Sequence, residues 1–312
     1  MSQVPQGFRA DLPRWQQLVL AHWLAALLAG QAVAAAPGAH WKLFEVGCDA
    51  RPSYLQGHIP GAAYLDTLQF ETLPLWNKVA DAQLLGVLQA AGIEPHTTVI
   101  LYGRNSLAAA RVAHLLLYAG VLDVRLLDGG LAAWLALPQR LAAGDVPHQP
   151  SDPTRTAWTG VFPARPQWLT DTAQARQLLA RPDAALVSIR SRAEFMGETS
   201  GYDYIAARGE IPGALWGHAG RDGDVNHMGS FQQADGCMKP AAEIAQVWAD
   251  AGILPHMRIA FYCGTGWRAS LAFFYAWLMG WEHISVYDGG WLEWSSDPAN
   301  PVICRTQAAQ TS

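Results

Sequence analysis

Phe261-Tyr262-Cys263-Gly264-Thr265-Gly266-Trp267-Arg268 is the stretch of this 312-residue chain that decides its fold and its chemistry. The apolar residues 258–262 predict a buried strand that ends at Cys263, and a helical pattern follows over residues 268–279. A thiol in a glycine-rich turn between a strand and a helix faces backbone N–H groups and the positive end of the helix dipole. Such surroundings favour the thiolate, so we interpret Cys263 as a nucleophile and not as an inert packing residue.

Outward from this stretch, the two halves of the chain repeat each other. One set of residues recurs 160 positions later: Tyr102, Gly120, Asp128, Gly129, Gly130 and Trp134 return as Tyr262, Gly280, Asp288, Gly289, Gly290 and Trp294. A second set, Gly-His-Ile-Pro-Gly-Ala at 57–62, returns 152 positions later as Gly-Glu-Ile-Pro-Gly-Ala at 209–214. Two ordered sets of matches at nearly constant offset predict a duplicated domain.

Each half alternates short apolar segments with helical ones. The expected strands are 41–46, 97–102 and 124–127, then 186–189, 258–262 and 284–287; the expected helices are 80–91 and 107–119, then 241–251 and 268–279. This alternation predicts an α/β fold with two tandem domains, each a mostly parallel sheet with helices on both faces. We place the domains at 15–148 and 166–304, joined by a linker at 149–165. Ligands of such folds bind beyond the carboxyl ends of the strands, where Cys263 lies.

Composition argues against several kinds of partner. The net charge is −5 at pH 7 and no basic run occurs, so we expect no nucleic-acid partner. Apolar residues make up 51% of the chain, yet no stretch is long and clean enough to span a bilayer, so no membrane partner is expected. The four cysteines are scattered, without Cys-x-x-Cys or short His/Cys spacing. Neither a metal site nor a disulfide framework is predicted, although disulfides between distant cysteines stay open.

The N-terminal region allows two interpretations. Residues 18–36 are rich in Ala and Leu, follow Arg9 and Arg14, and contain Ala32-Val33-Ala34, a pattern similar to a secretory signal and its cleavage site. However, residues 22–30 also have the pattern of a short amphipathic helix that a glycine ends. We therefore expect mature structure and a cytoplasmic protein, with a periplasmic protein as the alternative.

Four motifs accompany the repeat. They are Arg-x-x-Tyr-x-x-Gly-His-Ile-Pro-Gly-Ala in the first half, Gly-Glu-Ile-Pro-Gly-Ala in the second, Asp-Gly-Gly-x-x-x-Trp in both, and Tyr-Cys-Gly-Thr-Gly-Trp-Arg. Together, over residues 15–304, they resemble a two-domain rhodanese, a sulfurtransferase, and the cysteine loop is similar to that of the thiosulfate sulfurtransferase branch. The resemblance implies that Cys263 takes a sulfane sulfur from a donor as a persulfide and passes it to a nucleophilic acceptor. It implies no metal and no organic cofactor.

The loop residues fit this chemistry. Gly264 and Gly266 can adopt positive φ, which lets successive N–H groups curl around a thiolate or a persulfide anion. Thr265 is expected to add its N–H group. Arg268 offers a positive fork suited to a sulfonate or carboxylate of the donor, unless it is a helix-surface arginine. Trp267 is either a wall of the pocket or core packing.

The resemblance also assigns a second cation. The family's aspartate-x-arginine motif, followed by a glutamate and an aromatic residue, stands here as Ser188-Ile189-Arg190 and Glu194-Phe195. Arg190 is thus a candidate for binding the donor, although Ser188 replaces the aspartate that would orient it. Asp288 is expected to brace the loop and not to touch substrate.

The first half lacks the reactive groups. Gly103 falls at the position of Cys263, and Ala108 falls at that of Arg268. The first domain is therefore predicted to be catalytically inactive and to form one wall of a cleft between the domains.

Several features outside the loop are candidates for shaping that cleft. Trp76 and Arg104 of the first half could reach into it, although such residues are more often surface or packing. The second half carries two insertions, at 196–208 and within 217–236, which are plausible sources of specificity. The second insertion contains three polar residues without metal-like spacing, namely His218, Arg221 and His227.

Two other functions fit parts of the pattern. A phosphatase of the same fold would have a loop one residue longer, whereas the spacing Cys263-x4-Arg268 gives a smaller ring that suits a single sulfur atom. A non-catalytic binding module would not require the cysteine, the glycines and the arginine together. Within sulfur transfer, thiosulfate is the expected donor and 3-mercaptopyruvate the alternative. The acceptor (cyanide, a small thiol or a protein thiol) is left open.

Overall fold

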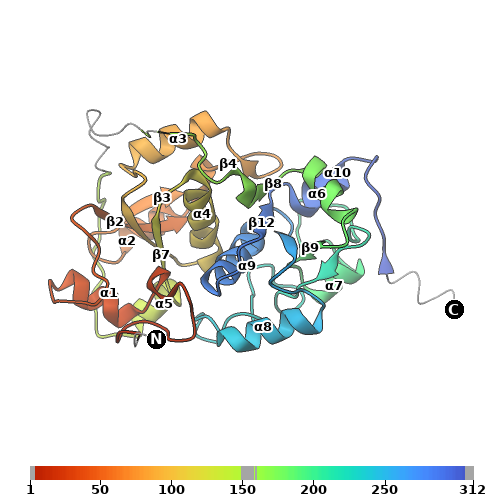
Figure 1. Ribbon diagram of the computed structural model, residues 1–312. Helices are drawn as coiled ribbons and strands as arrows, with labels where there is room; N and C mark the ends of the chain where they lie inside the picture. Colours follow the sequence, from red (N-terminus) through yellow and green to blue (C-terminus); the bar gives the residue numbers. More distant parts are fainter. Residues whose placement is uncertain (1–3, 149–157, 159, 306–312) are drawn as a thin grey trace.

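The computed structural model describes residues 4–148, 158 and 160–305 as two α/β domains that lie side by side (Figure 1). The first domain has a five-stranded sheet in the order β1-β7-β6-β2-β3, and all of its paired strands are parallel. Its strands are β1 (Leu18–Val19), β2 (Trp41–Gly47), β3 (Ala63–Asp66), β6 (Thr98–Gly103) and β7 (Asp123–Leu127).

The second sheet repeats this order. It runs β8-β12-β11-β9-β10, again with parallel pairs only. Its strands are β8 (Leu169–Thr170), β9 (Ala184–Ser188), β10 (Leu215–Trp216), β11 (Arg258–Tyr262) and β12 (Ile284–Tyr287). The duplicated, mostly parallel architecture that the sequence predicts is therefore confirmed.

Helices cover both faces of each sheet. In the first domain, alternate residues of β2 and β6 belong to different hydrophobic clusters, one packed against α1 and α5 and the other against α3 and α4. The second domain is built the same way, with α6 and α10 on one face and α8 and α9 on the other. The helices are α1 (Ala21–Leu28), α2 (Arg51–Gln56), α3 (Asp81–Ala90), α4 (Ser106–Ala119), α5 (Gly130–Leu135), α6 (Thr172–Leu179), α7 (Arg192–Met196), α8 (Ala241–Asp250), α9 (Trp267–Leu278) and α10 (Gly290–Ser296).

The Ala- and Leu-rich N-terminal segment is part of the first domain. Its strand β1 pairs with β7 at the edge of the sheet, and α1 buries Trp23 and Leu24 in the first domain's core. Among the described residues, no helix combines the length and the hydrophobicity that crossing a bilayer would need. Most of the predicted linker, residues 149–157 and 159, lies outside the described residues, so the domain boundaries stay predictions.

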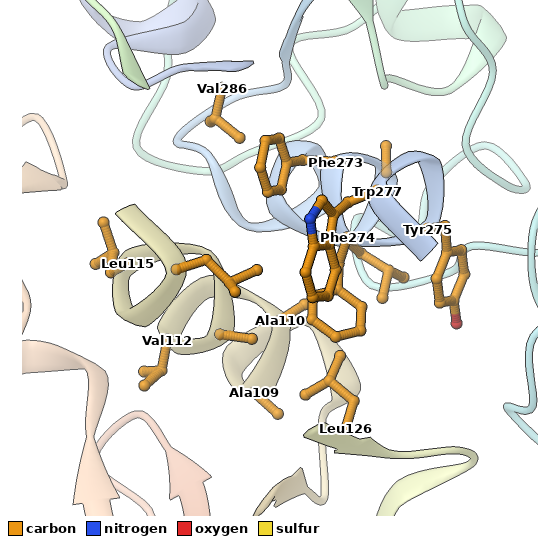
Figure 2. Packing of buried hydrophobic residues seen from close by; sticks show 14 of the residues in the cluster. Ala109, Ala110, Val112, Leu115, Leu126, Phe273, Phe274, Tyr275, Trp277 and Val286 are labelled. Carbon is orange, nitrogen blue, oxygen red and sulfur yellow. The ribbon is translucent and has the colours of Figure 1, made fainter. Parts of the chain in front are cut away.

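The two domains meet along α4 and α9, which pack against each other (Figure 2). Small residues of α4, such as Ala109 and Ala110, face the large rings of Phe273, Phe274 and Trp277 on α9. Both helices are apolar and buried on nearly every side, as expected of helices enclosed between two sheets. One continuous hydrophobic core therefore spans both domains, and it fixes the first domain against the start of α9.

Candidate active site

The loop after β11 closes tightly around the sulfur of Cys263. This side chain is fully buried, and its Sγ accepts a hydrogen bond from the Gly266 amide at 3.2 Å. Gly266 has a φ of 103° and is the N-cap of α9, so a left-handed residue turns the loop into the helix. The first N–H groups of a helix have no partners within it and concentrate its positive dipole end. This geometry stabilises a thiolate or a persulfide anion at Cys263.

Helix α10 orients the loop from behind. Its amides at Trp291 and Leu292 donate to the carbonyl oxygens of Cys263 (2.7 Å) and Gly264 (3.1 Å). Because C=O and N–H point in opposite directions across a trans peptide, the amides of Gly264 and Thr265 face away from α10. The predicted curl of N–H groups is thus imposed by the helix that follows β12.

Gly264 is required for space and not for its backbone angle. The expected positive φ occurs at Gly266, whereas Gly264 is outside the left-handed region, so this part of the prediction is wrong. A Cβ on Gly264 would lie 2.2 Å from a ring carbon of Tyr202, which is closer than close-packed atoms approach. Tyr202 belongs to the first insertion of the second domain, so this insertion packs directly on the loop.

Arg268 braces the loop. Its Nη1 and Nη2 each donate to the carboxylate of Glu194 at 2.8 Å, and Nη2 also donates to the Tyr202 hydroxyl at 3.0 Å. Burial would raise the pKa of Glu194, but the positive charges of Arg268 and Arg190 outweigh it and hold the pKa at about 2. The pair is therefore ionised near neutral pH and ties the start of α9 to α7. The positive charge of Arg268 is therefore already paired with the carboxylate of Glu194.

Arg190 lies beneath the loop among carboxylates. It is fully buried, and its guanidinium lies 3.5 Å from the carboxylates of Glu194 and Glu210. Ser188 donates to Glu210 at 2.7 Å, so Glu210 supplies the carboxylate that Ser188 lacks. In the repeat, Glu210 stands where the first half has His58, and this difference was the available signal for its role. Binding of a donor by Arg190 stays a prediction.

A cavity of about 240 Å³ lies beside the loop, between the two domains. Trp76 lines it, as the sequence suggests, and its backbone has a φ of 61°, a strained conformation of the kind that gathers at functional sites. Both insertions of the second domain contribute to the lining, and Trp267 forms part of the wall. The lining residues are Cys48, Trp76 and Leu107 of the first domain and Tyr202, Tyr204, Val225, Asn226, Thr265, Trp267 and Arg268 of the second.

Other candidates from the sequence lie away from this cavity. Arg104 binds Glu45 at 2.9 Å within the first domain. His218 stacks on Trp216, and His227 accepts a hydrogen bond from the Arg221 amide. Within the described part of the chain, no group of three or more His, Cys, Asp or Glu side chains is placed to hold a metal ion.

The first domain also contributes a buried cluster of charged residues beside the loop, which no local sequence motif marks. Arg111 of α4 donates to Glu71 at 2.8 Å and, across the interface, to Asp288 at 2.6 Å. Glu71 lies on the hairpin of β4 (Glu71–Thr72) and β5 (Asn77–Lys78), and it accepts from the Trp267 indole at 3.0 Å. Burial raises the pKa of Glu71 to about 7, although Arg111 opposes the shift. We call Arg111, Glu71 and Asp288 the Arg111 cluster. An arginine inside the apolar segment 107–119 was the signal for it.

Comparison with known proteins decides the family. The model of the Rhodanese-like domain matches this chain twice, at residues 21–137 and 171–297. The chain belongs to the rhodanese family. Thiosulfate sulfurtransferase YnjE of Escherichia coli is 53% identical over 302 residues, which cover 96% of this chain and 68% of that relative. A probable 3-mercaptopyruvate sulfurtransferase of Pseudomonas aeruginosa is 33% identical over 80% of this chain and 85% of its own length.

Solved structures with the same fold agree with this assignment. The crystal structure of YnjE superimposes with a TM-score of 0.89 at 52% identity and covers 93% of this chain and 69% of its own. The anaerobic ergothioneine biosynthesis enzyme of Chlorobium limicola, in complex with trimethyl histidine, has a TM-score of 0.88 at 39% identity over 93% of this chain and 71% of its own. These comparisons confirm the predicted tandem rhodanese fold and the sulfurtransferase class. The class implies a sulfur donor and an acceptor as partners.

The first rhodanese domain repeats the frame of the loop without its thiol. The second glycine of each Asp-Gly-Gly motif is left-handed, with φ of 56° at Gly130 and 54° at Gly290. A Cβ on Gly130 would lie 2.5 Å from the Gly103 carbonyl oxygen, and one on Gly290 would lie 2.7 Å from that of Gly264. Both glycines therefore allow a helix to approach the loop before it, but in the first domain the residue at the reactive position is Gly103.

Proposed function

We propose that this rhodanese transfers a sulfane sulfur from thiosulfate to a thiophilic acceptor through a persulfide on Cys263. The thiolate attacks the outer sulfur of thiosulfate, the S–S bond breaks, and sulfite leaves with the bonding electron pair. The acceptor then attacks the outer sulfur of the persulfide, and Cys263 leaves as a thiolate. The observation that carries this proposal is the hydrogen bond from the Gly266 amide to Cys263 Sγ at 3.2 Å.

The relatives favour thiosulfate over 3-mercaptopyruvate as the donor. The Escherichia coli relative that is 53% identical is named a thiosulfate sulfurtransferase, whereas the probable 3-mercaptopyruvate sulfurtransferase of Pseudomonas aeruginosa is 33% identical. Arg268 is the one charged side chain among the described residues that line the cavity, and both of its terminal nitrogens bind Glu194. Either anion would therefore rely on the loop amides and the helix N-terminus, and 3-mercaptopyruvate is the alternative donor.

The aromatic lining supports a second candidate for the acceptor. Four rings surround the cavity, those of Trp76, Tyr202, Tyr204 and Trp267. Aromatic faces bind flat heteroaromatic rings and quaternary ammonium groups. The enzyme of Chlorobium limicola is in complex with trimethyl histidine, which carries both groups. We therefore propose a trimethylated histidine as an acceptor to test beside cyanide and thiols.

Two broader proposals concern the partner and the location. Tyr204 lines the cavity and is 53% exposed, so part of the lining is accessible from solvent, which supports a protein thiol as a further acceptor. A cytoplasmic location is supported by the N-terminal segment, since β1 and α1 are integral to the first domain.

Cys263→Ser tests the proposed function. Wild-type protein treated with thiosulfate should gain one sulfur in its intact mass and should convert cyanide to thiocyanate, and Cys263→Ser should do neither. Cys48→Ser is the control, because Cys48 is a free thiol that lines the cavity but lies outside the loop. Steady-state rates with thiosulfate and with 3-mercaptopyruvate, measured in parallel, rank the two donors. Rates with cyanide, glutathione and trimethyl histidine rank the acceptors. Full activity of Cys263→Ser would refute the proposal, and hydrolysis of an aryl phosphate without any sulfur adduct would favour a phosphatase.

A further inference from the structure

Arg111 has a donor group that its ion pairs do not use. The side chain is fully buried, and its Nε and Nη2 bind Glu71 and Asp288. Its Nη1 has no hydrogen-bond partner among the described residues. This nitrogen lies against the catalytic loop, 3.3 Å from the point that a Cβ on Gly266 would occupy. A buried N–H group without a partner costs free energy, so its position at this loop requires an explanation.

The loop residue that Arg111 faces is the residue that binds the sulfur. The amide of Gly266 donates to Cys263 Sγ at 3.2 Å. The sulfur and the guanidinium thus lie against the same glycine, which has no side chain to intervene. In a site closed to water, the charges gathered behind this glycine affect the free energy of the thiolate or persulfide.

Every buried arginine near the loop is paired with carboxylates. Arg268 binds Glu194, Arg190 lies between Glu194 and Glu210, and Arg111 binds Glu71 and Asp288. Each of the three also has a nitrogen without a partner among the described residues. Arg111 differs in its place, because it is the arginine that lies against Gly266, and it neutralises two carboxylates that would otherwise repel an anion on the sulfur.

The repeat supplies an independent observation. The residue 160 positions after Arg111 is Leu271 on α9, and Leu271 lies in a small cavity together with Gly103. The inactive loop of the first domain therefore faces a leucine at the place where the active loop faces an arginine. The cation and the thiol are present together at one loop and absent together at the other.

We propose that Arg111 of the non-catalytic first domain is a positioning residue of the active site, which packs against the loop at Gly266 and neutralises the carboxylates behind the sulfur. Glu71 and Asp288 fix its guanidinium from the two domains, and Glu71 also binds Trp267 of the loop. The first domain is then part of the catalytic machinery. The consequences for turnover rest on the proposed sulfur transfer, but those for the thiol of Cys263 do not.

Two substitutions of Arg111 test this role. Alkylation of Cys263 by iodoacetamide is followed across pH by mass spectrometry of the peptide that contains Cys263. Arg111→Gln should move the midpoint of the alkylation curve up by about one pH unit and slow persulfide formation from thiosulfate about tenfold. Arg111→Lys keeps the positive charge, so its alkylation midpoint should lie close to that of the wild type. Its rate of sulfur transfer should stay below that of the wild type, because the guanidinium fork is lost.

The control is another buried arginine of the first domain. Arg125 is 4% exposed and pairs with Asp123 at 2.7 Å. Arg125→Gln should lower stability without moving the midpoint. An unchanged midpoint in folded Arg111→Gln would overturn the proposal. If Arg111→Gln fails to fold, Arg111→Lys provides the test, because sulfur transfer at the wild-type rate in that variant would also overturn the proposal. Wild-type protein that forms no persulfide would refute the proposed function alone, because the alkylation curves would still test Arg111.

Discussion

Glu194→Gln is predicted to destabilise the catalytic domain by several kcal/mol. Glu194 is 2% exposed and holds Arg268 through two hydrogen bonds of 2.8 Å, so it ties α7 to the start of α9. It also accepts from the Ser191 amide in the capping box of α7. Glutamine has nearly the same shape but no charge, so the substitution leaves a buried arginine without its counter-ion.

The magnitude follows from the pKa of Glu194. Burial alone would raise it, but Arg268 and Arg190 lower it from 4.5 to about 2. At roughly 1.4 kcal/mol per pKa unit, the carboxylate contributes about 3 kcal/mol. Measured losses on removal of one partner of a buried pair, about 3–5 kcal/mol, agree with this value. Because the folded pKa is depressed, this stability is present above pH 4.5 and is lost as pH falls through about 2. The penalty of the substitution should therefore be constant from pH 5 to 8.

Urea unfolding of wild type and Glu194→Gln at pH 5 and 8 measures the loss. The matched control is Asp145→Asn, because Asp145 pairs with Arg51 at 2.6 Å and both side chains are about half exposed. That surface pair should contribute less than about 1 kcal/mol. A loss below about 1 kcal/mol in Glu194→Gln, or one that changes between pH 5 and 8, would refute the reasoning.

Two further substitutions test the loop and the Arg111 cluster. Gly264→Ala should reduce sulfur transfer at least about tenfold, because its Cβ would lie 2.2 Å from the Tyr202 ring. The double variant Gly264→Ala/Tyr202→Ala should be more active than the two single losses of activity, added as free energies, would predict. Additive effects in this double-mutant cycle would contradict the steric explanation. Glu71 has a folded pKa raised from 4.5 to about 7, so wild-type stability should fall by up to about 3 kcal/mol as pH rises between these values. Glu71→Gln should lack that fall in urea unfolding at pH 5 and 8, and an identical pH dependence in both proteins would exclude Glu71 as its source.

The long periodic elements of this fold could be predicted from the sequence. The strand predicted at 258–262 is β11, and the helix predicted at 268–279 differs from α9 by one residue at each end. Strands β1, β8 and β10 escaped prediction because two residues are too few to show a period. Their places at the sheet edges are set by pairing with distant strands.

The reactive cysteine could also be predicted, but the partners of its loop could not. Cys263 is marked by its immediate neighbours in the sequence, whereas Arg268 finds Glu194 only after α7 and α9 have packed together. The same is true of Arg111, whose partners Glu71 and Asp288 lie on different domains. Local pattern therefore identifies the nucleophile, and the tertiary fold decides which carboxylates each arginine binds and which arginine lies against Gly266.

The duplication explains how the active site came to need both domains. Each Asp-Gly-Gly aspartate crosses the interface: Asp128 accepts from the Met238 amide at 2.7 Å, and Asp288 accepts from the Lys78 amide at 2.8 Å. These two hydrogen bonds occur beside both the inactive and the active loop, so they hold the domains together and do not by themselves make a loop reactive. The arginine breaks the symmetry, because only Asp288 is bound by an arginine of the facing helix, and only the loop beside it carries the thiol. A catalytic domain separated from its inactive copy would therefore keep Cys263 but lose Arg111, and Asp288 would be left without its cation.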